Sequence, residues 1–282
     1  MFVDSDDAIT STALEELYSI AKNFDADVVY CEKFYKTEIG EKFTTNIKFL
    51  RESNRGHLNP EEFVKKPTPM PKDIDKRLES FGRKKFWTAC WNYLFNHNLI
   101  RQENIRFPLV YIGEDEIFDL QCICLSKNVI RVPNKIYIWR THEKAFSREL
   151  LSTEKYIERW VSTIFQGIPL IDEFIDKLHI GLKSNNYKHL IFESFITEKR
   201  VDILNSMYAQ IPAWQLDEFI RRELEKVKDK TSLTAFLFSR MNVFNVNLNR
   251  QYAMLYQMNA HIQKQNEVIK NLQAEVNRLQ QK

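Results

Sequence analysis

Acidic residues near the start of the chain could hold a divalent cation. The motif Asp4-Ser5-Asp6-Asp7 directly follows a short apolar stub. Carboxylates crowded at the end of a strand repel one another unless a cation neutralises them. Mg²⁺ and Mn²⁺ prefer such oxygen ligands and often bridge to substrate phosphates. An EF-hand calcium loop is excluded because its glycine and late glutamate are missing. The motif predicts a metal site, unless the acids only favour the dipole of the next helix.

A second acidic motif could supply a general base. Gly113-Glu114-Asp115-Glu116 stands at the start of a segment with helical character. A carboxylate placed in a site can accept a proton from a substrate hydroxyl. Capping and dipole chemistry alone can also place three acids at a helix start, so both interpretations stay open.

A third segment, residues 137–142 (YIWRTH), ends a predicted strand with an arginine and a histidine. Arg140 offers a guanidinium group that could bind a phosphate. His142 could bind a metal ion through its imidazole, although a lone histidine is more often structural. The segment therefore predicts a phosphate contact and a candidate metal ligand.

The elements around these motifs predict an α/β fold. A capping box from Thr12 to Glu15 is typical of a helix start. In chain order we expect the end of a strand at 1–4, a helix from 12, strands at 27–31 and 86–94, a helix at 114–125 and a strand pair at 129–139 that turns at Pro133. Strand–helix–strand units of this kind form parallel sheets.

After residue 148 the sequence changes to helical patterns. Residues 152–240 show a period of 3.6 with few strand signals, and breaks are expected at 167–169, 184–186 and 211–212. We therefore expect three parts. They are an α/β domain at 1–148, a helical domain at 149–245 and a C-terminal helix at 246–282.

The C-terminal helix carries an apolar heptad pattern. Position a is occupied by Leu248, Leu255, Ile262, Ile269 and Val276, and position d by Gln251, Met258, Gln265, Leu272 and Leu279. Ile or Val at a with Leu at d favours a parallel dimer. The pattern predicts a homodimer through a coiled coil, the alternative being a single amphipathic helix that folds back on its own domain.

Composition excludes several classes of protein. The chain has 282 residues and a net charge of +3, too close to neutral to indicate nucleic acid as a partner. No run of about 18 apolar residues exists, so no membrane span is expected, and the acidic start is not a signal peptide. The four cysteines are interpreted as reduced core thiols. The predicted location is the cytoplasm, including a peripheral place at the inner face of the membrane.

Five segments in order resemble the second half of a family 2 glycosyltransferase of the GT-A fold. They are FVDSDD, ALEELYSIAKNFDADVVYC, WNYLFNHNLIRQENIRF, GEDEIF and IYIWRTHEKAFS, and they cover roughly residues 1–148. The bacterial members that build surface polysaccharides look most similar. The resemblance implies a partial GT-A fold with a Rossmann-like mixed sheet. The all-helical segment and the C-terminal coiled-coil helix come after this sheet in the chain. It also implies an inverting transfer of sugar from a nucleotide-sugar donor to a saccharide or lipid-linked acceptor.

The resemblance also implies roles for individual residues. Those that would bind the donor are Asp4, Asp6, Asp7 and Arg140, and those that would hold Mn²⁺ or Mg²⁺ are Asp6, Asp7 and His142. Asp115 would be the base that deprotonates the acceptor hydroxyl. Glu114 would support the base or contact the acceptor, and Trp91 would line the acceptor site.

The chain departs from this family in one large respect. Members normally begin with a strand of the type VSVIIPVYN and a second acidic motif, which hold the nucleotide, and no such segment occurs here. Three explanations are open: a start assigned at an internal methionine, a truncated and inactive product, or a missing half supplied by another chain. We favour a misassigned or truncated start. The competing function is therefore a catalytically inactive remnant that acts as an oligomeric interaction protein.

Overall fold

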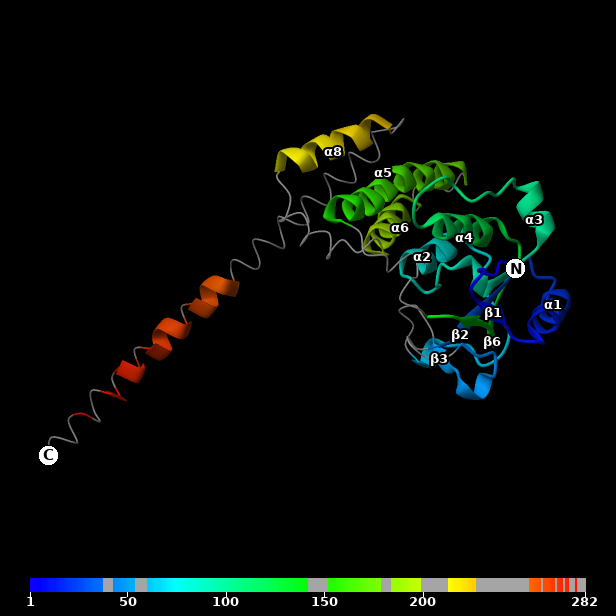
Figure 1. The fold of residues 1–282 in the computed structure, drawn as a ribbon, viewed down its shortest axis with the longest axis horizontal. Coiled ribbons are helices and arrows are strands. Elements are labelled where there is room, and N and C mark those ends of the chain that lie inside the picture. Colours follow the sequence, from blue (N-terminus) through cyan, green and yellow to red (C-terminus); the bar gives the residue numbers. More distant parts are fainter. Residues whose placement is uncertain are drawn as a thin grey trace. The chain divides into compact units, whose positions relative to one another are not determined.

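The computed structural model describes residues 1–37, 43–53, 60–141, 152–178, 184–198 and 213–226, together with helical pieces between 254 and 277 (Figure 1). The chain divides into two units, Met1–Lys230 and Thr231–Lys282. The first unit holds the whole predicted α/β domain and most of the predicted helical domain. The domain boundaries predicted after residues 148 and 245 stay predictions.

A mixed sheet forms the centre of the first unit. Its strands are β1 (Ala8–Ile9), β2 (Val28–Lys36), β3 (Arg51–Ser53), β4 (Thr68–Pro69), β5 (Tyr93–Phe95) and β6 (Val129–Trp139). Their order is β1-β6-β2-β3, with β4 also paired to β6 and β5 to β2. Strands β2 and β6 are parallel, and the other pairs are antiparallel. The predicted mixed α/β fold is confirmed.

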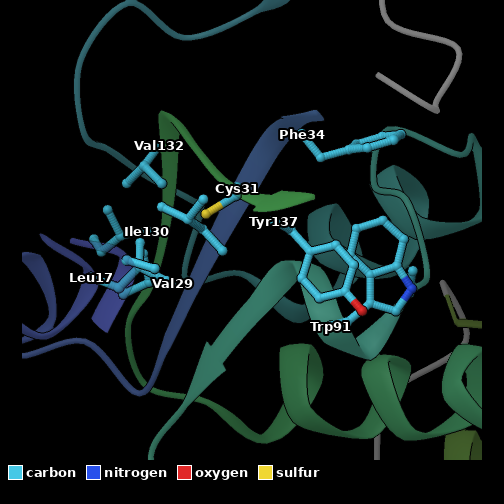
Figure 2. Close-up of a cluster of buried hydrophobic side chains, with 11 residues drawn as sticks. Leu17, Val29, Cys31, Phe34, Trp91, Ile130, Val132 and Tyr137 are labelled. Atoms are coloured by element: carbon cyan, nitrogen blue, oxygen red, sulfur yellow. The ribbon is translucent and has the colours of Figure 1, made fainter. Parts of the chain in front are cut away.

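The core lies along β2 and β6, whose sequences are apolar enough to be buried on both faces. Helix α1 (Ala13–Asn23) buries Ala13 and Leu17 against these strands. Figure 2 shows an aliphatic group around Leu17 and Val29 and an aromatic group of Phe34, Trp91 and Tyr137. The tyrosine of the aromatic group lies near the end of β6 that leads to Arg140.

Shorter helices complete this part of the fold. They are α2 (Ile74–Gly82), α3 (His97–Gln102) and α4 (Glu114–Leu125), with 3-10 turns at Ile47–Phe49, Pro60–Glu62 and Cys90–Asn92. The helix predicted at 114–125 is confirmed at both ends. Gly113 precedes it with a φ of 89°, a left-handed conformation that glycine adopts at little cost.

The helical prediction for 152–240 is confirmed over the described residues. These form α5 (Thr153–Lys177), α6 (Ser184–Glu198) and α8 (Ala213–Lys226). The break predicted at 167–169 is wrong, because α5 continues through Pro169. A Cβ at Gly167 would lie 2.3 Å from the Phe195 ring, so this glycine allows α5 and α6 to approach closely. None of the described helices has the length and apolar character needed to cross a membrane.

Other local predictions also need correction. Residues 1–4 form no strand, and 86–92 form a loop and a 3-10 turn rather than a strand, with β5 starting at Tyr93. Pro133 does not turn the chain. It lies within β6, where the register with β2 shifts, a place that tolerates a residue without an N–H donor. The helix starts after Thr12 as predicted, but the Thr12 hydroxyl donates to Glu16 instead of forming a capping box.

In the second unit the described residues between 254 and 277 are helical. The a-position side chains Leu255, Ile262 and Ile269 are about half exposed. The predicted C-terminal helix is confirmed over these residues. Its pairing into a coiled coil stays a prediction.

Candidate active site

The carboxylate of Asp7 ties the first acidic motif to the end of β6. One of its oxygens accepts the backbone N–H of Arg140 at 2.7 Å, and the other accepts the hydroxyl of Tyr137 at 2.7 Å. Partial burial raises the pKa of Asp7 to about 6, against the lowering effect of these two hydrogen bonds. The charges of Asp6 and Asp4 raise the pKa of Asp7 further. This carboxylate is therefore an internal anchor as well as a part of the acidic motif.

The rest of the motif forms a tight turn on this anchor. The Asp7 N–H donates to the carbonyl of Asp4 at 3.1 Å, and the Asp4 N–H donates to the Tyr137 oxygen at 3.1 Å. The side chains of Asp4 and Asp6 are exposed. Burial, and next the charge of Asp6, raise the pKa of the Asp4 carboxyl. The turn therefore presents two carboxylates to solvent while the third faces inward.

Trp91 supports Tyr137 from the side. The two rings are stacked with centroids 4.1 Å apart and planes 19° from parallel, as Figure 2 shows. Only 7% of Trp91 is exposed, so most of its indole serves packing. Its predicted contact with an acceptor stays a prediction. In the structure it acts on the acidic motif through Tyr137.

The second acidic motif lies beside the first. Phe2, two residues before Asp4, packs edge-on against Phe118 of α4, with ring centroids 5.5 Å apart. Phe2 also packs against Phe107, which stacks on Phe118 at 4.1 Å. These contacts fix the start of the chain on the helix whose first turn holds Asp115.

The thiol of Cys90 is affected by the charges of both acidic motifs. Burial raises the pKa of its thiol most, and the charges of Asp119, Asp115, Asp4 and Glu114 raise this pKa further. Carboxylates of both motifs therefore contribute to the electrostatic environment of one thiol. Glu114 and Asp115 are half-buried at the helix start. The packing of Phe2 on Phe118 thus joins the segment before the first acidic motif to the helix that begins with the second.

The acidic turn fits a metal ion only if substrate completes the coordination. Among the residues that the structure describes, no three His, Cys, Asp or Glu side chains are grouped to hold a metal. Mg²⁺ commonly needs only one or two carboxylates when substrate phosphates and waters provide the other oxygens. Asp4 and Asp6 could supply the two carboxylates, and Asp7 still has lone pairs available beside its hydrogen bonds. His142 lies outside the described residues.

Two further residues near the acidic motifs are given no role by the sequence. Tyr137 begins the segment 137–142, but a tyrosine in an apolar strand resembles ordinary core, so the sequence assigns it no role of its own. Asp119 is fully buried, and neither carboxylate oxygen has a hydrogen-bond partner within the described part of the chain. An acid one helical turn after Asp115, inside the apolar run FDLQCICL, was a signal that could have been noticed.

Comparisons with known proteins find similarity to glycosyltransferases. No protein-family model matches the chain. The chain is 25% identical over 171 residues to the glycosyltransferase GlyA of Streptococcus pneumoniae, which covers 60% of this chain and 22% of GlyA. It is 33% identical over 143 residues to the cholesterol galactosyltransferase of Borreliella burgdorferi, which covers 49% of this chain and 36% of that protein.

Among solved structures, the chain is similar to residues 1–349 of S. aureus TarS in complex with UDP-GlcNAc. The TM-score is 0.49 and the sequence identity 14%, over 78% of this chain and 54% of that chain. The chain spans well under half the length of the two curated relatives named above. Both relatives are glycosyltransferases, and the predicted relation of this chain to glycosyltransferases is confirmed.

Proposed function

We propose that this chain belongs to a metal-dependent, inverting glycosyltransferase of family 2 with the GT-A fold. It moves a sugar from a nucleotide-sugar donor to a saccharide or lipid-linked acceptor in bacterial surface polysaccharide synthesis. One observation carries the proposal: the segment that leads into the first acidic motif packs through Phe2 on Phe118 of α4, the helix whose first turn holds the second acidic motif. The glycosyltransferases among its relatives support the same reaction class.

The first acidic motif binds the donor diphosphate. Asp6 and Asp7, with Asp4 beside them, would hold a divalent cation, and Arg140 would add a guanidinium that binds the diphosphate. When bound, Mn²⁺ or Mg²⁺ supplies positive charge that stabilises the leaving diphosphate. The Tyr137 hydroxyl and the Arg140 N–H hold the Asp7 carboxylate in place, so that the turn does not reorganise during transfer.

The second motif activates the acceptor. Asp115 takes the proton from the acceptor hydroxyl, and Glu114 orients that hydroxyl. The acceptor oxygen then forms a bond to the anomeric carbon as the bond from that carbon to the diphosphate oxygen breaks. The electron pair of the broken bond leaves with the diphosphate. A single displacement from the opposite face inverts the anomeric configuration.

The reaction is tested with the purified chain, Mn²⁺ and a panel of nucleotide sugars. We expect donor turnover that EDTA abolishes and that Asp115→Asn lowers by at least ~100-fold, because a general base contributes about 10²–10⁴-fold. Glu225→Gln is the matched control, since it neutralises an exposed carboxylate on α8, far along the chain from either motif. Equal turnover in Asp115→Asn and the control would refute the assigned base.

The competing proposal of an inactive remnant makes a different prediction for binding. An active site of the kind proposed binds Mn²⁺ and a nucleoside diphosphate jointly, so calorimetry should show that each strengthens binding of the other. A chain that binds neither ligand and turns over no donor would favour the interaction protein. In that case the coiled-coil helix would be the functional part.

We further propose that the chain is a homodimer through residues 246–282. The half-exposed side chains of Leu255, Ile262 and Ile269 support this, because apolar side chains at heptad spacing are stabilised when a second helix covers them. A parallel pair joins two copies of the first unit in one particle. Two linked sites would raise the avidity for an acceptor that carries repeated sugar units.

A further inference from the structure

Helix α5 is hydrogen-bonded to the loop that leads into the second acidic motif. The backbone N–H of Ile112 donates to the hydroxyl oxygen of Thr163 at 3.2 Å. Thr163 is fully buried, and its hydroxyl donates to the carbonyl of Arg159 at 2.9 Å. Because the hydroxyl proton is used within α5, the oxygen lone pairs are left to face the Ile112 amide.

This hydrogen bond restrains the backbone directly before the helix turn that carries Asp115. Ile112 comes directly before Gly113, whose left-handed backbone starts α4. The Ile117 N–H then donates to the Gly113 carbonyl at 3.2 Å and closes the first helical turn. A rotation at Gly113 would change the direction of the Asp115 side chain, and the Ile112 hydrogen bond restrains the loop side of that glycine.

The far end of α4 is restrained as well. The guanidinium of Arg77, on α2, donates to the carbonyls of Ile123, Ser126 and Lys127 at distances of 2.5–3.2 Å. Helix α2 in turn packs on α6, where a Cβ at Gly82 would lie 2.7 Å from Leu190. Figure 1 shows α4 beside α5, and α2 beside α6.

We infer that α5 and α6 hold helix α4 in position, and that Thr163 is a positioning residue for Asp115 through the amide of Ile112. The helical segment thus holds α4 at both ends, directly through α5 and indirectly through α2 and α6. This inference rests on the proposed role of Asp115 as the base. A helix held at both ends keeps the carboxylate within the sub-ångström tolerance that proton transfer needs.

The hydrogen bond itself is tested without turnover, by amide hydrogen exchange of residues 107–116 in the full chain. Thr163→Val keeps the shape of the side chain and removes the acceptor, so exchange at Ile112 should accelerate by ~10-fold or more. Thr163→Ser keeps the hydroxyl and should stay within ~3-fold of the parent chain. Unchanged exchange in Thr163→Val would overturn the inference, whatever the chain catalyses.

Kinetics then separate positioning from general stability. Thr163→Val should lower kcat by roughly 10–100-fold with the donor KM within ~2-fold, because a misplaced base slows chemistry without touching the donor. Thr163→Ser should restore kcat. Ser162→Ala, which removes the neighbouring buried hydroxyl of α5, is the matched control and should leave kcat within ~2-fold. A parental kcat in Thr163→Val, in a chain that Asp115→Asn inactivates, would overturn the inference and leave the proposed function intact.

Discussion

The hydroxyl of Tyr137 donates a 2.7 Å hydrogen bond to the carboxylate of Asp7, across 130 residues of sequence. Burial raises the pKa of Tyr137 well above its usual value, so the hydroxyl keeps its proton and stays a donor throughout the working pH range. Trp91 stacks on the same ring and limits its movement. The orientation of the acidic turn therefore depends on an aromatic pair in the core.

Removing the tyrosine hydroxyl should weaken donor binding. In Tyr137→Phe, Asp7 loses a hydrogen bond to its charged form, a contact worth about 1.5–3 kcal/mol. We expect joint affinity for Mn²⁺ and a nucleoside diphosphate to fall by at least ~10-fold in calorimetry. Tyr30→Phe is the matched control, because it removes another buried tyrosine hydroxyl, one that accepts the Trp87 N–H. Equal affinity in both variants would show that the Asp7 contact has no role in binding.

The sequence predicts an element correctly where its capping residues and apolar pattern agree with the contacts that the element makes in the fold. Both ends of helix α4 are predicted correctly, because a glycine precedes three acids and an apolar run follows them. Strand β6 was wrongly divided at Pro133, because the bulge that accommodates this proline depends on the partner strand β2. Residues 86–92 look like a strand by composition, yet their aromatic rings pack into the core from a loop.

The acidic residues of the candidate site could be predicted from the sequence. The residues that hold them in position could not. Both acidic motifs can be predicted from residue type and order. Adjacent carboxylates repel one another, and such clusters often mark functional sites. Their support by Tyr137 and Thr163 depends on contacts between distant segments, which no local pattern encodes. A single serine or threonine within a long helix carries no visible sign that its hydroxyl holds a remote loop.

Asp119 should make the stability of the fold decrease as pH rises. Burial first, and then the charges of Asp115 and Glu116, raise the pKa of this carboxyl well above its usual value near 4. The folded chain keeps the proton while the unfolded chain loses it above that value. The stabilisation is complete below about pH 4 and is lost as pH rises toward the folded pKa, at up to about 1.4 kcal/mol per pH unit.

Asp119→Asn removes this titration and keeps the shape of the side chain. The variant should therefore gain stability relative to the parent chain between pH 5 and pH 8, as measured by urea unfolding at both values. Glu225→Gln, which changes an exposed carboxylate, should show a constant difference from the parent. Parallel pH dependence in Asp119→Asn and the parent would mean that Asp119 is ionised in the folded chain.

Arg77 should be essential for stability although it lies outside the acidic site. Its buried guanidinium donates to four carbonyl oxygens, three at the end of α4 and one on Pro71. Lysine keeps the charge but lacks the planar fork that reaches several carbonyls. We expect Arg77→Lys to lower the free energy of unfolding by about 2–4 kcal/mol. Arg83→Lys, on the same helix with an exposed ion pair to Glu79, should change it by less than about 1 kcal/mol.

The C-terminal helix should control the oligomeric state through its a positions. Ile262 and Ile269 lie seven residues apart and are 48% and 50% exposed, so each presents apolar surface that a second copy would cover. The double substitution Ile262→Asn and Ile269→Asn would place two polar amides in the seam of a parallel dimer, which costs stability at each a position. Light scattering should then give the mass of a monomer at concentrations where the parent chain gives that of a dimer. Lys264→Asn, at an outer position of the same heptad, should leave the dimer intact, and a monomeric parent chain would refute the coiled coil.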